Sequence, residues 1–395
     1  NCMSDSIVIV GAARTPMGSF QGDFSSLAAH DLGGVAIAAA MARAGLAADA
    51  VDEVLMGNCL MAGQGQAPAR QAAFKAGLPK GAGAVTLSKM CGSGMRAAMF
   101  ATDMLRAGSA NVVVAGGMES MTNAPYLLLK GRGGYRMGHD KVYDHMMLDG
   151  LEDAYQPGRS MGTFGEECAA KYTFTREQQD AFATASVERA KAAGSNGAFA
   201  KEIAPVTVKE RSGDRVVSID EGPGKVKLDK ISSLRPAFKK DGTITAGSAS
   251  QISDGAAAVL MMTEEKAAAL GLRARARIVD TCNVGVDPVL MLTGPIDATR
   301  HLLQRNHLSI DDIDVFEVNE AFASVVLAWQ KEVGADPAKT NPNGGAIALG
   351  HPLGGTGAFL TTKALYELER TGGRYGLISM CCGGGLGTGT LIERL

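Results

Sequence analysis

The chain has 395 residues, of which 46% are hydrophobic and 20% are charged, a balance that excludes a disordered chain and allows a large core. The formal net charge of −2 argues against a nucleic-acid partner for the molecule as a whole, and no apolar run reaches the roughly 18 residues of a membrane span. Seven cysteines in so long a chain do not form a disulfide framework, and no CxxC pair occurs, so we expect a reducing, cytoplasmic setting and no metal site.

Residues 1–120 alternate short apolar runs with helical patterns, which is typical of an α/β fold. The apolar run 111–120 either lies buried within one subunit or pairs with a second copy across a two-fold axis. Two predicted helices end at a glycine, as helices commonly do. We predict strands at 6–10, 51–59 and 111–120, and helices at 32–46 and 95–108.

The stretch 121–252 has a different character, because its first part is irregular and broken by glycines. Between 201 and 240 it carries ten Lys/Arg against six Asp/Glu. This basic surface either binds phosphate groups or is a solvated face. The apolar run 253–263 predicts a buried strand that returns the chain to its first half, so we interpret 121–252 as an inserted domain.

The last part of the chain repeats the α/β order of the first. The segment 354–372 aligns with 91–108, since both have Gly-Ser/Thr-Gly before a helix and a closing glycine, and 315–320 aligns with 54–59. We infer an internal duplication, with halves at 3–120 plus 253–273 and at 274–395. Within the second half we predict helices at 296–306 and 356–372, and strands at 275–285, 313–322 (running into the apolar segment 321–334), 375–385 and 387–395.

Four segments place reactive side chains beside glycine. A lone buried cysteine or histidine is more often a packing residue than a functional one. Here, however, the four segments fall at strand ends or helix starts, where ligands collect in α/β sheets. A thiol at a helix N-terminus also ionises more readily, which favours a nucleophile. The segments are 91–94 with Cys91, 318–323 with Asn319 and Glu320, 343–357 with His351, and 380–385 with Cys381 and Cys382.

With these motifs the chain resembles the thiolase family, and among its members the biosynthetic acetyl-CoA acetyltransferases. The resemblance extends over essentially the whole length, from VIVGAARTPMGSFQG through CGSGM, GGMESMTNAPY, LRPAF, TAGSASQISDGAAA, VNEAFA and NGGAIALGHPLGGTGA to CCGGG. It implies an α/β fold of five layers, α-β-α-β-α, built from two duplicated βα halves with an inserted loop domain that binds CoA.

The resemblance also implies the catalytic roles. Cys91 resembles the nucleophile that becomes acylated, and His351 resembles the histidine that activates it. Cys381 resembles the base that removes a proton from the methyl carbon of an acetyl thioester. Asn319 is expected to hold a water that stabilises the enolate oxygen together with His351, while the backbone N–H groups of Cys91 and Gly383 form a second oxyanion hole.

For the remaining residues the resemblance implies binding or support. Cys382 is expected to pack, and Glu320 to orient the neighbouring segment. Ser160 stands where short-chain enzymes usually have a histidine that touches the pantetheine. The substrate-binding set is Met161 and Met291 at the acyl pocket, Ser250 at the pantetheine arm, and Ser160, Ala321 and Phe322 beside them.

The activity implied is that of an acyl-CoA C-acyltransferase, which condenses two acetyl-CoA to acetoacetyl-CoA and catalyses the reverse thiolysis. CoA is then a co-substrate, no prosthetic group is required, and the expected partners are acyl-CoA, CoA and further copies of the chain as a dimer or a dimer of dimers. The alternatives are a 3-ketoacyl-CoA thiolase for longer or bulkier chains, a β-ketoacyl synthase and a non-catalytic acyl-CoA-binding protein. A dinucleotide-binding enzyme is disfavoured because no GxGxxG follows the first strand.

Overall fold

The computed structural model describes residues 6–395, so the predictions that fall on residues 1–5 lie outside the described part. Two runs of alternating strands and helices flank a long insertion. The first run comprises β1 (Ile7–Arg14), β2 (Gly18–Ser19), α1 (Ala29–Ala44), β3 (Glu53–Gly57), α2 (Pro68–Lys75), β4 (Gly83–Leu87), α3 (Ser93–Ala107), β5 (Val112–Ser120) and, after the insertion, β10 (Ser253–Thr263). The second comprises α6 (Glu264–Ala269), β11 (Ala276–Gly285), α7 (Gly294–Arg305), β12 (Val315–Val318), α8 (Ala323–Val333), α9 (Thr356–Thr371), β13 (Tyr375–Cys382) and β14 (Leu386–Arg394).

The central strands read as nearly continuous apolar runs because helices cover both of their faces. Every residue of β1 and of β5 is buried. The helices α1, α3 and α9 each stop at a glycine in the left-handed region, with φ of 70° at Gly45, 73° at Gly108 and 76° at Gly372. These stops confirm the helix ends that the sequence predicts.

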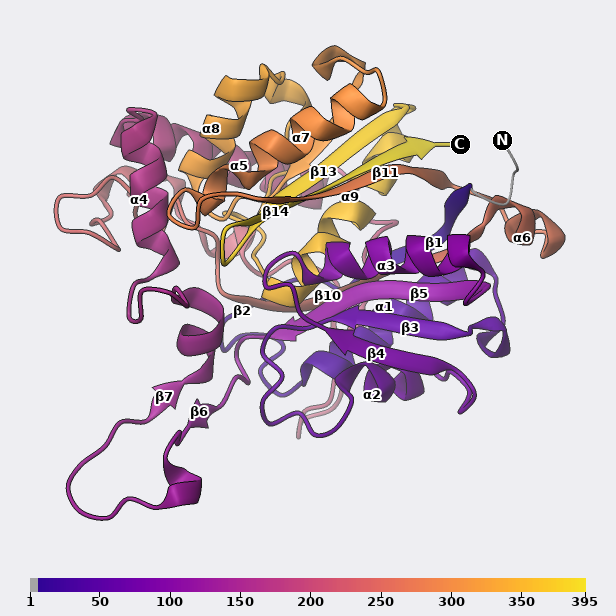
Figure 1. Cartoon of the computed structure of the whole chain (residues 1–395), viewed down its shortest axis with the longest axis horizontal. Coiled ribbons are helices and arrows are strands. Elements are labelled where there is room, and N and C mark those ends of the chain that lie inside the picture. The colour runs from indigo at the N-terminus through magenta and orange to yellow at the C-terminus, as the bar shows by residue number, and fades with distance from the viewer. Residues whose placement is uncertain (1–5) are drawn as a thin grey trace.

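The layers follow the predicted α-β-α-β-α arrangement. Helices α3 and α9 contact each other and lie between the two groups of strands, whereas α1 and α2 pack on the outer face of one group and α7 and α8 cover the other (Figure 1). The two groups are joined at one edge, where β1 pairs with β11 through Val8–Arg277 and Ile9–Ala276. The strand order is therefore continuous, β12-β13-β14-β11-β1-β10-β5-β3-β4, with β2 beside β10.

The two halves share the same strand order and the same strand directions. The order β3-β5-β10-β1 of the first half matches β12-β13-β14-β11 of the second, with the first pair parallel and the others antiparallel in both. In register, Gly57 of β3 lies opposite Gly117 of β5, and Val318 of β12 lies opposite Ser379 of β13. The structure thus shows the duplication that the sequence repeat predicts.

The strand β5 cannot pair with a second copy, so that reading of the run 111–120 is wrong. Its two sides are hydrogen-bonded to β3 and β10 within the chain. The free edge on this side of the sheet is β4, where Val85 is 48% exposed. The alternative reading, a buried strand within one subunit, is confirmed.

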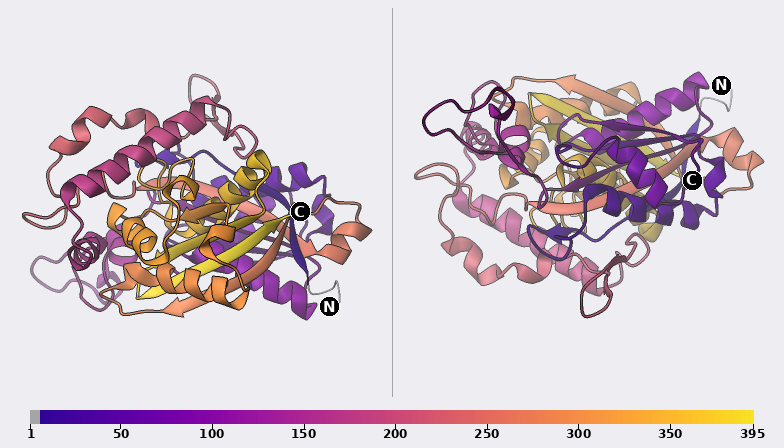
Figure 2. Two further views of the ribbon diagram at one scale, coloured as in Figure 1. Left: turned by 90° about the horizontal axis from the view of Figure 1, so that it is seen from above. Right: turned by 90° about the horizontal axis from the view of Figure 1, so that it is seen from below.

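The insertion runs from β5 to β10 and gathers mostly at the end of the molecule opposite the termini (Figure 2). It contains β6 (Tyr126–Leu127), β7 (Tyr143–Asp144), a π-helical turn (Met147–Leu151), α4 (Met161–Lys171), α5 (Arg176–Ser195), β8 (Val206–Val208) and β9 (Arg215–Val217). Residues 126–144, which we call the arm, project away from the body (Figure 1). A buried Arg14 ties the insertion to β1, because it pairs with Glu202 at 2.7 Å and Asp220 at 2.8 Å.

Candidate active site

Cys91 sits at a sharp backbone turn directly before α3. The preceding residue, Met90, has φ of 52°, in the left-handed region that residues other than glycine rarely adopt. The Cys91 sulfur accepts hydrogen bonds from its own backbone N–H and from that of Gly383. Among the cysteines that the structure describes, Cys91 alone is partly exposed, and the others are buried. The turn therefore aims two N–H groups at the thiol of the one described cysteine that is not fully buried as a residue.

Burial controls the ionisation of this thiol. Desolvation, and after it a charge on Cys382, raises the pKa of Cys91 to about 12, while the two backbone N–H groups lower it. Burial thus has a larger effect on the pKa of Cys91 than the position of the thiol at a helix N-terminus. The thiol is not easily ionised, contrary to the expectation from the sequence. Cys91 is therefore a neutral thiol at rest and needs a base in order to act as a nucleophile.

The His351 imidazole has a ring nitrogen that is able to accept a proton. Its Nδ1 lies 2.6 Å from the Thr356 hydroxyl, and that hydroxyl also donates to the Pro352 carbonyl at 3.1 Å. Because a hydroxyl has one proton to donate, we assign the Nδ1 proton to the imidazole, which leaves Nε2 as an acceptor. Burial lowers the pKa of His351 to about 4, so the ring is neutral at pH 7.

Cys381 lies at the end of β13 inside a hydrophobic cluster. The cluster includes Phe164 and Phe322, with Met161 and Phe238 packed against it. Burial raises the pKa of Cys381 well above its usual value, and a charge on Cys91 raises it further. The two thiols therefore disfavour ionising together, so Cys381 ionises more easily while Cys91 carries no charge.

Asn319, which follows β12, is fully buried, yet neither its amide oxygen nor its amide nitrogen has a hydrogen-bond partner. Buried polar groups in native proteins are nearly always paired, and an unpaired one needs an explanation such as a bound water or a catalytic role. An amide left free beside the other predicted residues fits the expectation that Asn319 holds a water.

Two neighbouring residues have supporting contacts. Cys382 is buried and lies beneath the start of α3, because a Cβ on Gly92 would lie 2.5 Å from its sulfur. Glu320 accepts from Ser186 Oγ at 2.6 Å and Asn341 Nδ2 at 2.9 Å. These contacts hold the turn that leads to the His351 segment.

A cavity of about 220 Å³ opens beside His351 and brings together most of the predicted substrate residues. Its wall is mainly apolar and takes Met147 and Leu151 from the π-helical turn. Ala321 does not line it, but its carbonyl accepts from the Ser250 N–H at 2.9 Å. The side chain of Met291 lies outside what the structure describes. The predicted residues on the wall are Ser160, Met161, Ser250, Phe322 and His351, joined by Met121, Gly162, Phe238, Ala249, Gln251, Ile252 and Leu353.

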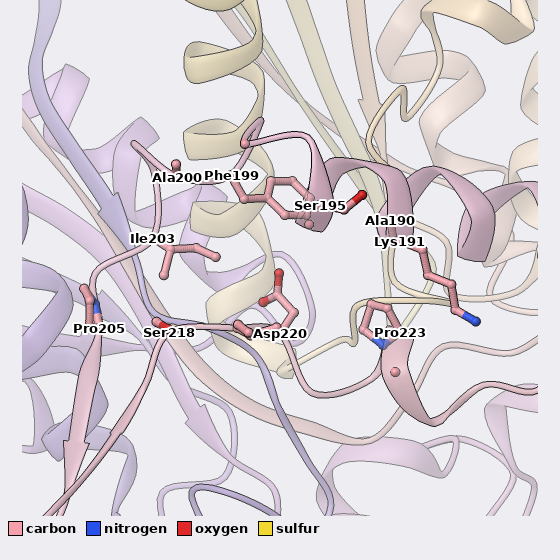
Figure 3. A pocket seen from close by; sticks show the side chains of 14 residues that line it. Ala190, Lys191, Ser195, Phe199, Ala200, Ile203, Pro205, Ser218, Asp220 and Pro223 are labelled. Carbon is pink, nitrogen blue, oxygen red and sulfur yellow. The ribbon is translucent and has the colours of Figure 1, made fainter.

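A larger cavity, of about 510 Å³, lies elsewhere, between the end of α5 and the loop that follows β9 (Figure 3). Phe199, Ile203 and Asp220 line it, and none of the predicted catalytic or substrate-binding residues does. Size alone therefore does not locate the site. The smaller cavity is assigned because His351 and four of the predicted substrate-binding residues line it, and because Cys381 belongs to the same hydrophobic cluster as Phe322 of its wall.

Comparison with known proteins agrees with this geometry. Residues 7–265 match the family described as thiolase, N-terminal domain, and residues 272–394 match thiolase, C-terminal domain. The chain belongs to the thiolase family. It is 50% identical over 391 residues to the acetyl-CoA acetyltransferase of Rhizobium meliloti, covering 99% of each chain, and 47% identical over 394 residues to that of Shinella zoogloeoides, covering 100% of each. A solved structure of acetyl-CoA acetyltransferase from Syntrophomonas wolfei superposes with a TM-score of 0.96 at 41% identity, with 99% of each chain covered.

Sequence reasoning missed several parts of this thiolase's site. Thr356 orients the imidazole. The Gly-Thr-Gly motif at 355–357, where α9 begins, is a local pattern from which this residue could have been found. No local sequence pattern indicates the left-handed conformation of Met90 or the contacts of the buried Glu119. Among residues 6–395, no cluster of three or more His, Cys, Asp or Glu is placed to hold a metal ion, and no helix is long and apolar enough to cross a membrane.

Proposed function

We propose that this thiolase is an acyl-CoA C-acyltransferase that condenses two acetyl-CoA to acetoacetyl-CoA and catalyses the reverse thiolysis through an S-acyl intermediate on Cys91. The observation that carries the proposal is the Cys91 thiol, which two backbone N–H groups face and which packs against the cluster that contains Leu353, two residues after the neutral His351. Donors fixed at that point stabilise the negative oxygen of a tetrahedral intermediate.

In the first half-reaction, His351 Nε2 takes the proton of Cys91, and the thiolate attacks the carbonyl carbon of acetyl-CoA. The carbonyl oxygen becomes negative and is stabilised by the N–H groups of Cys91 and Gly383. The intermediate collapses, the bond to the CoA sulfur breaks, and the CoA thiolate takes a proton from Cys381. The products are acetyl-Cys91, free CoA, a Cys381 thiolate and a protonated His351, which balance each other in charge.

In the second half-reaction, the Cys381 thiolate removes a proton from the methyl carbon of another acetyl-CoA. The enolate oxygen accepts from the protonated His351 and from the water that Asn319 is proposed to hold. The carbanion attacks the acetyl carbonyl on Cys91, the carbon–sulfur bond breaks, and acetoacetyl-CoA forms. Cys91 recovers its proton from His351, so every group returns to its starting state.

The cavity supports a short acyl group. Its wall near the site consists of Met161, Phe238 and Phe322, while the Ser160 hydroxyl accepts from the Gly162 N–H and caps α4. The alternative is a preference for longer or bulkier acyl chains, and the small side chain of Ser160 supports it. Steady-state thiolysis of acetoacetyl-CoA and of longer 3-ketoacyl-CoAs separates the two, and a higher kcat/KM for the longer substrates contradicts the short-chain assignment.

The basic segment 201–240 is proposed to help hold the phosphates of CoA. Lys225 and Lys227 are exposed side chains of this segment, and Lys225 pairs with Glu221 at 2.7 Å. Basic groups bind phosphate directly, so CoA is the proposed co-substrate.

Acetylation of Cys91 tests the function. The protein is incubated with acetyl-CoA, and its peptides are mapped by mass spectrometry, with Cys91→Ala as the control. Acetyl on Cys91, together with thiolysis of acetoacetyl-CoA by CoA, is the expected result. Label confined to Cys382 or Cys2 contradicts the assignment, and binding of acetyl-CoA without turnover points to a non-catalytic acyl-CoA-binding protein.

We also propose that the thiolase is a homo-oligomer, a dimer or a dimer of dimers, in the cytoplasm. The unpaired edge of β4 offers a strand for a second copy, and the arm exposes Tyr126, Leu128 and Met137. The described cysteines are all free thiols, which suits a reducing compartment. Light scattering that gives a monomer mass at micromolar concentration contradicts the assembly.

A further inference from the structure

The carboxylate of Glu119, at the end of β5, joins two loops. Its Oε1 accepts from the N–H groups of Cys59 and Gly354, both at 2.9 Å. Its Oε2 accepts from Asn58 Nδ2 at 2.6 Å and from the Leu60 N–H at 3.1 Å. Glu119 is fully buried and does not line the cavity beside His351. Four hydrogen bonds from two loops thus converge on one buried carboxyl group, which fixes the positions of both loops.

One of these loops leads to the nucleophile. The Cys59 thiol donates to the carbonyl of Met90 at 2.9 Å, and the Ser93 hydroxyl donates to the same oxygen at 2.6 Å. Met90 is the residue in the left-handed conformation directly before Cys91. Such a conformation persists only where its surroundings hold it. Glu119 therefore supports the Cys91 turn through Cys59.

The other loop leads to the base, because Gly354 lies three residues after His351. This loop packs against the first half through main-chain contacts. A Cβ on Gly117 would lie 2.1 Å from the Gly354 carbonyl oxygen, and a Cβ on Gly354 would lie 2.7 Å from the Cα of Asn58. With no side chain between the two backbones, the hydrogen bond from Gly354 to Glu119 is a direct polar link across the halves.

The duplication shows why the carboxylate is at this point. In the shared strand register, Glu119 of the first half corresponds to Cys381 of the second, and Asn58 corresponds to Asn319. Gly354 stands at the position equivalent to the nucleophile. In the second half, the Asn319 amide therefore has no hydrogen-bond partner. In the first half, the Asn58 amide and the Gly354 N–H are both hydrogen-bonded to the Glu119 carboxylate.

We propose that Glu119 is a positioning residue, which sets the separation between the Cys91 nucleophile and the His351 base by holding both of their loops on one carboxylate. This role rests on the proposed functions of Cys91 and His351. It predicts that a change at Glu119 slows acyl transfer without weakening substrate binding, because the cavity wall keeps all its residues.

The test compares Glu119→Gln with Glu202→Gln, a matched change at another fully buried carboxylate, which pairs with Arg14. Rates of Cys91 acetylation, and kcat and KM for acetoacetyl-CoA, are measured at a temperature where both variants are folded. A misplacement of about 1 Å costs roughly 10²-fold in rate, so Glu119→Gln should lose about that much in kcat with an unchanged KM. Glu202→Gln should lower the melting temperature and keep kcat.

Wild-type acetylation rates in Glu119→Gln, or equal losses of kcat in the two variants, overturn the positioning role alone. Absence of acetyl from Cys91 in the wild-type enzyme overturns the proposed function instead. If Glu119→Gln does not fold, Cys59 tests the same link. Cys59→Ser keeps a donor to the Met90 carbonyl and should retain the rate, whereas Cys59→Ala loses that donor and should be slower; equal rates contradict the proposal.

Discussion

The imidazole of His351 and the hydroxyl of Thr356 form a hydrogen bond of 2.6 Å that fixes the histidine tautomer. His351 lies before a short turn at 353–355, and Thr356 is the first residue of α9, so the helix start fixes the position of the hydroxyl that holds the ring. Rotation of the ring would break this hydrogen bond. The Nε2 atom is on the side of the ring opposite Nδ1 and is left without a partner by this contact.

The buried histidine gives stability a defined pH dependence. The pKa of His351 is about 4 in the folded chain and about 6.5 in the unfolded chain, so between these values the unfolded chain binds the proton. Stability from this group is complete above about pH 6.5 and falls as the pH drops toward 4, by on the order of 3 kcal/mol. Urea unfolding at pH 7 and at about pH 4.5 should show a larger loss for the wild type than for His351→Gln, and equal losses contradict the assignment.

Variants of Cys91 and of Cys381, the two cysteines proposed to be catalytic, should differ in the kind of activity that they lose. Cys91→Ser keeps a hydroxyl but a far weaker nucleophile, so acyl transfer should fall by orders of magnitude while Cys381 still exchanges protons of bound acetyl-CoA. Cys381→Ala should still acetylate Cys91 but lose methyl proton exchange, by about 10²–10⁴-fold. Deuterium uptake into acetyl-CoA in heavy water, run beside acetyl labelling, measures both. Exchange at the wild-type rate in Cys381→Ala places the base elsewhere, with Cys382 or His351 next.

Asn319→Ala should lower activity without lowering stability in proportion. Its amide has no partner in the folded chain, so replacing it removes a desolvated polar group that nothing compensates. Removing one oxyanion donor costs about 10²–10³-fold in kcat. Thermal melts and condensation rates are measured together on the variant and the wild type. A large fall in melting temperature with an unchanged rate would show that Asn319 is structural.

Charge reversal on the basic segment tests the CoA phosphate site. Lys227→Glu should raise the KM for CoA about tenfold, since a hydrogen bond to a charged group contributes on the order of 1.5–3 kcal/mol. The kcat should not change, because the segment does not touch the reacting atoms. Lys80→Glu, at an exposed position between α2 and β4 and outside the basic segment, is the matched control. An unchanged KM at low salt makes Lys227 part of a solvated face.

The fold was predictable wherever the burial pattern was continuous. The run 253–263 was expected as a strand, and β10 spans the same residues. By contrast, β4 has five residues, none of which is fully buried. Its sequence therefore contains no long apolar run that would indicate a strand. Helix α5 was missed although Thr175 and Gln178 form a capping box at its start, because the irregular composition before it suggested loops throughout the insertion.

The sequence predicts site residues where a motif is local, but not where contacts join distant segments. Cys91, His351 and Cys381 each lie in a glycine-rich segment, and the segments predict a site only when they are taken together. Glu119 meets Gly354 across 235 residues, and that contact exists only after the two halves have packed. No pattern within either segment encodes it.

The equivalence of Glu119 and Cys381 in the two halves has a consequence for engineering a second thiol pair into this chain. In the first half, the position equivalent to Cys381 carries a carboxyl group that accepts four hydrogen bonds, and the position equivalent to Cys91 carries Gly354, which donates one of them. Introducing cysteines at these two positions would therefore remove the hydrogen bonds that join the loops of the two halves.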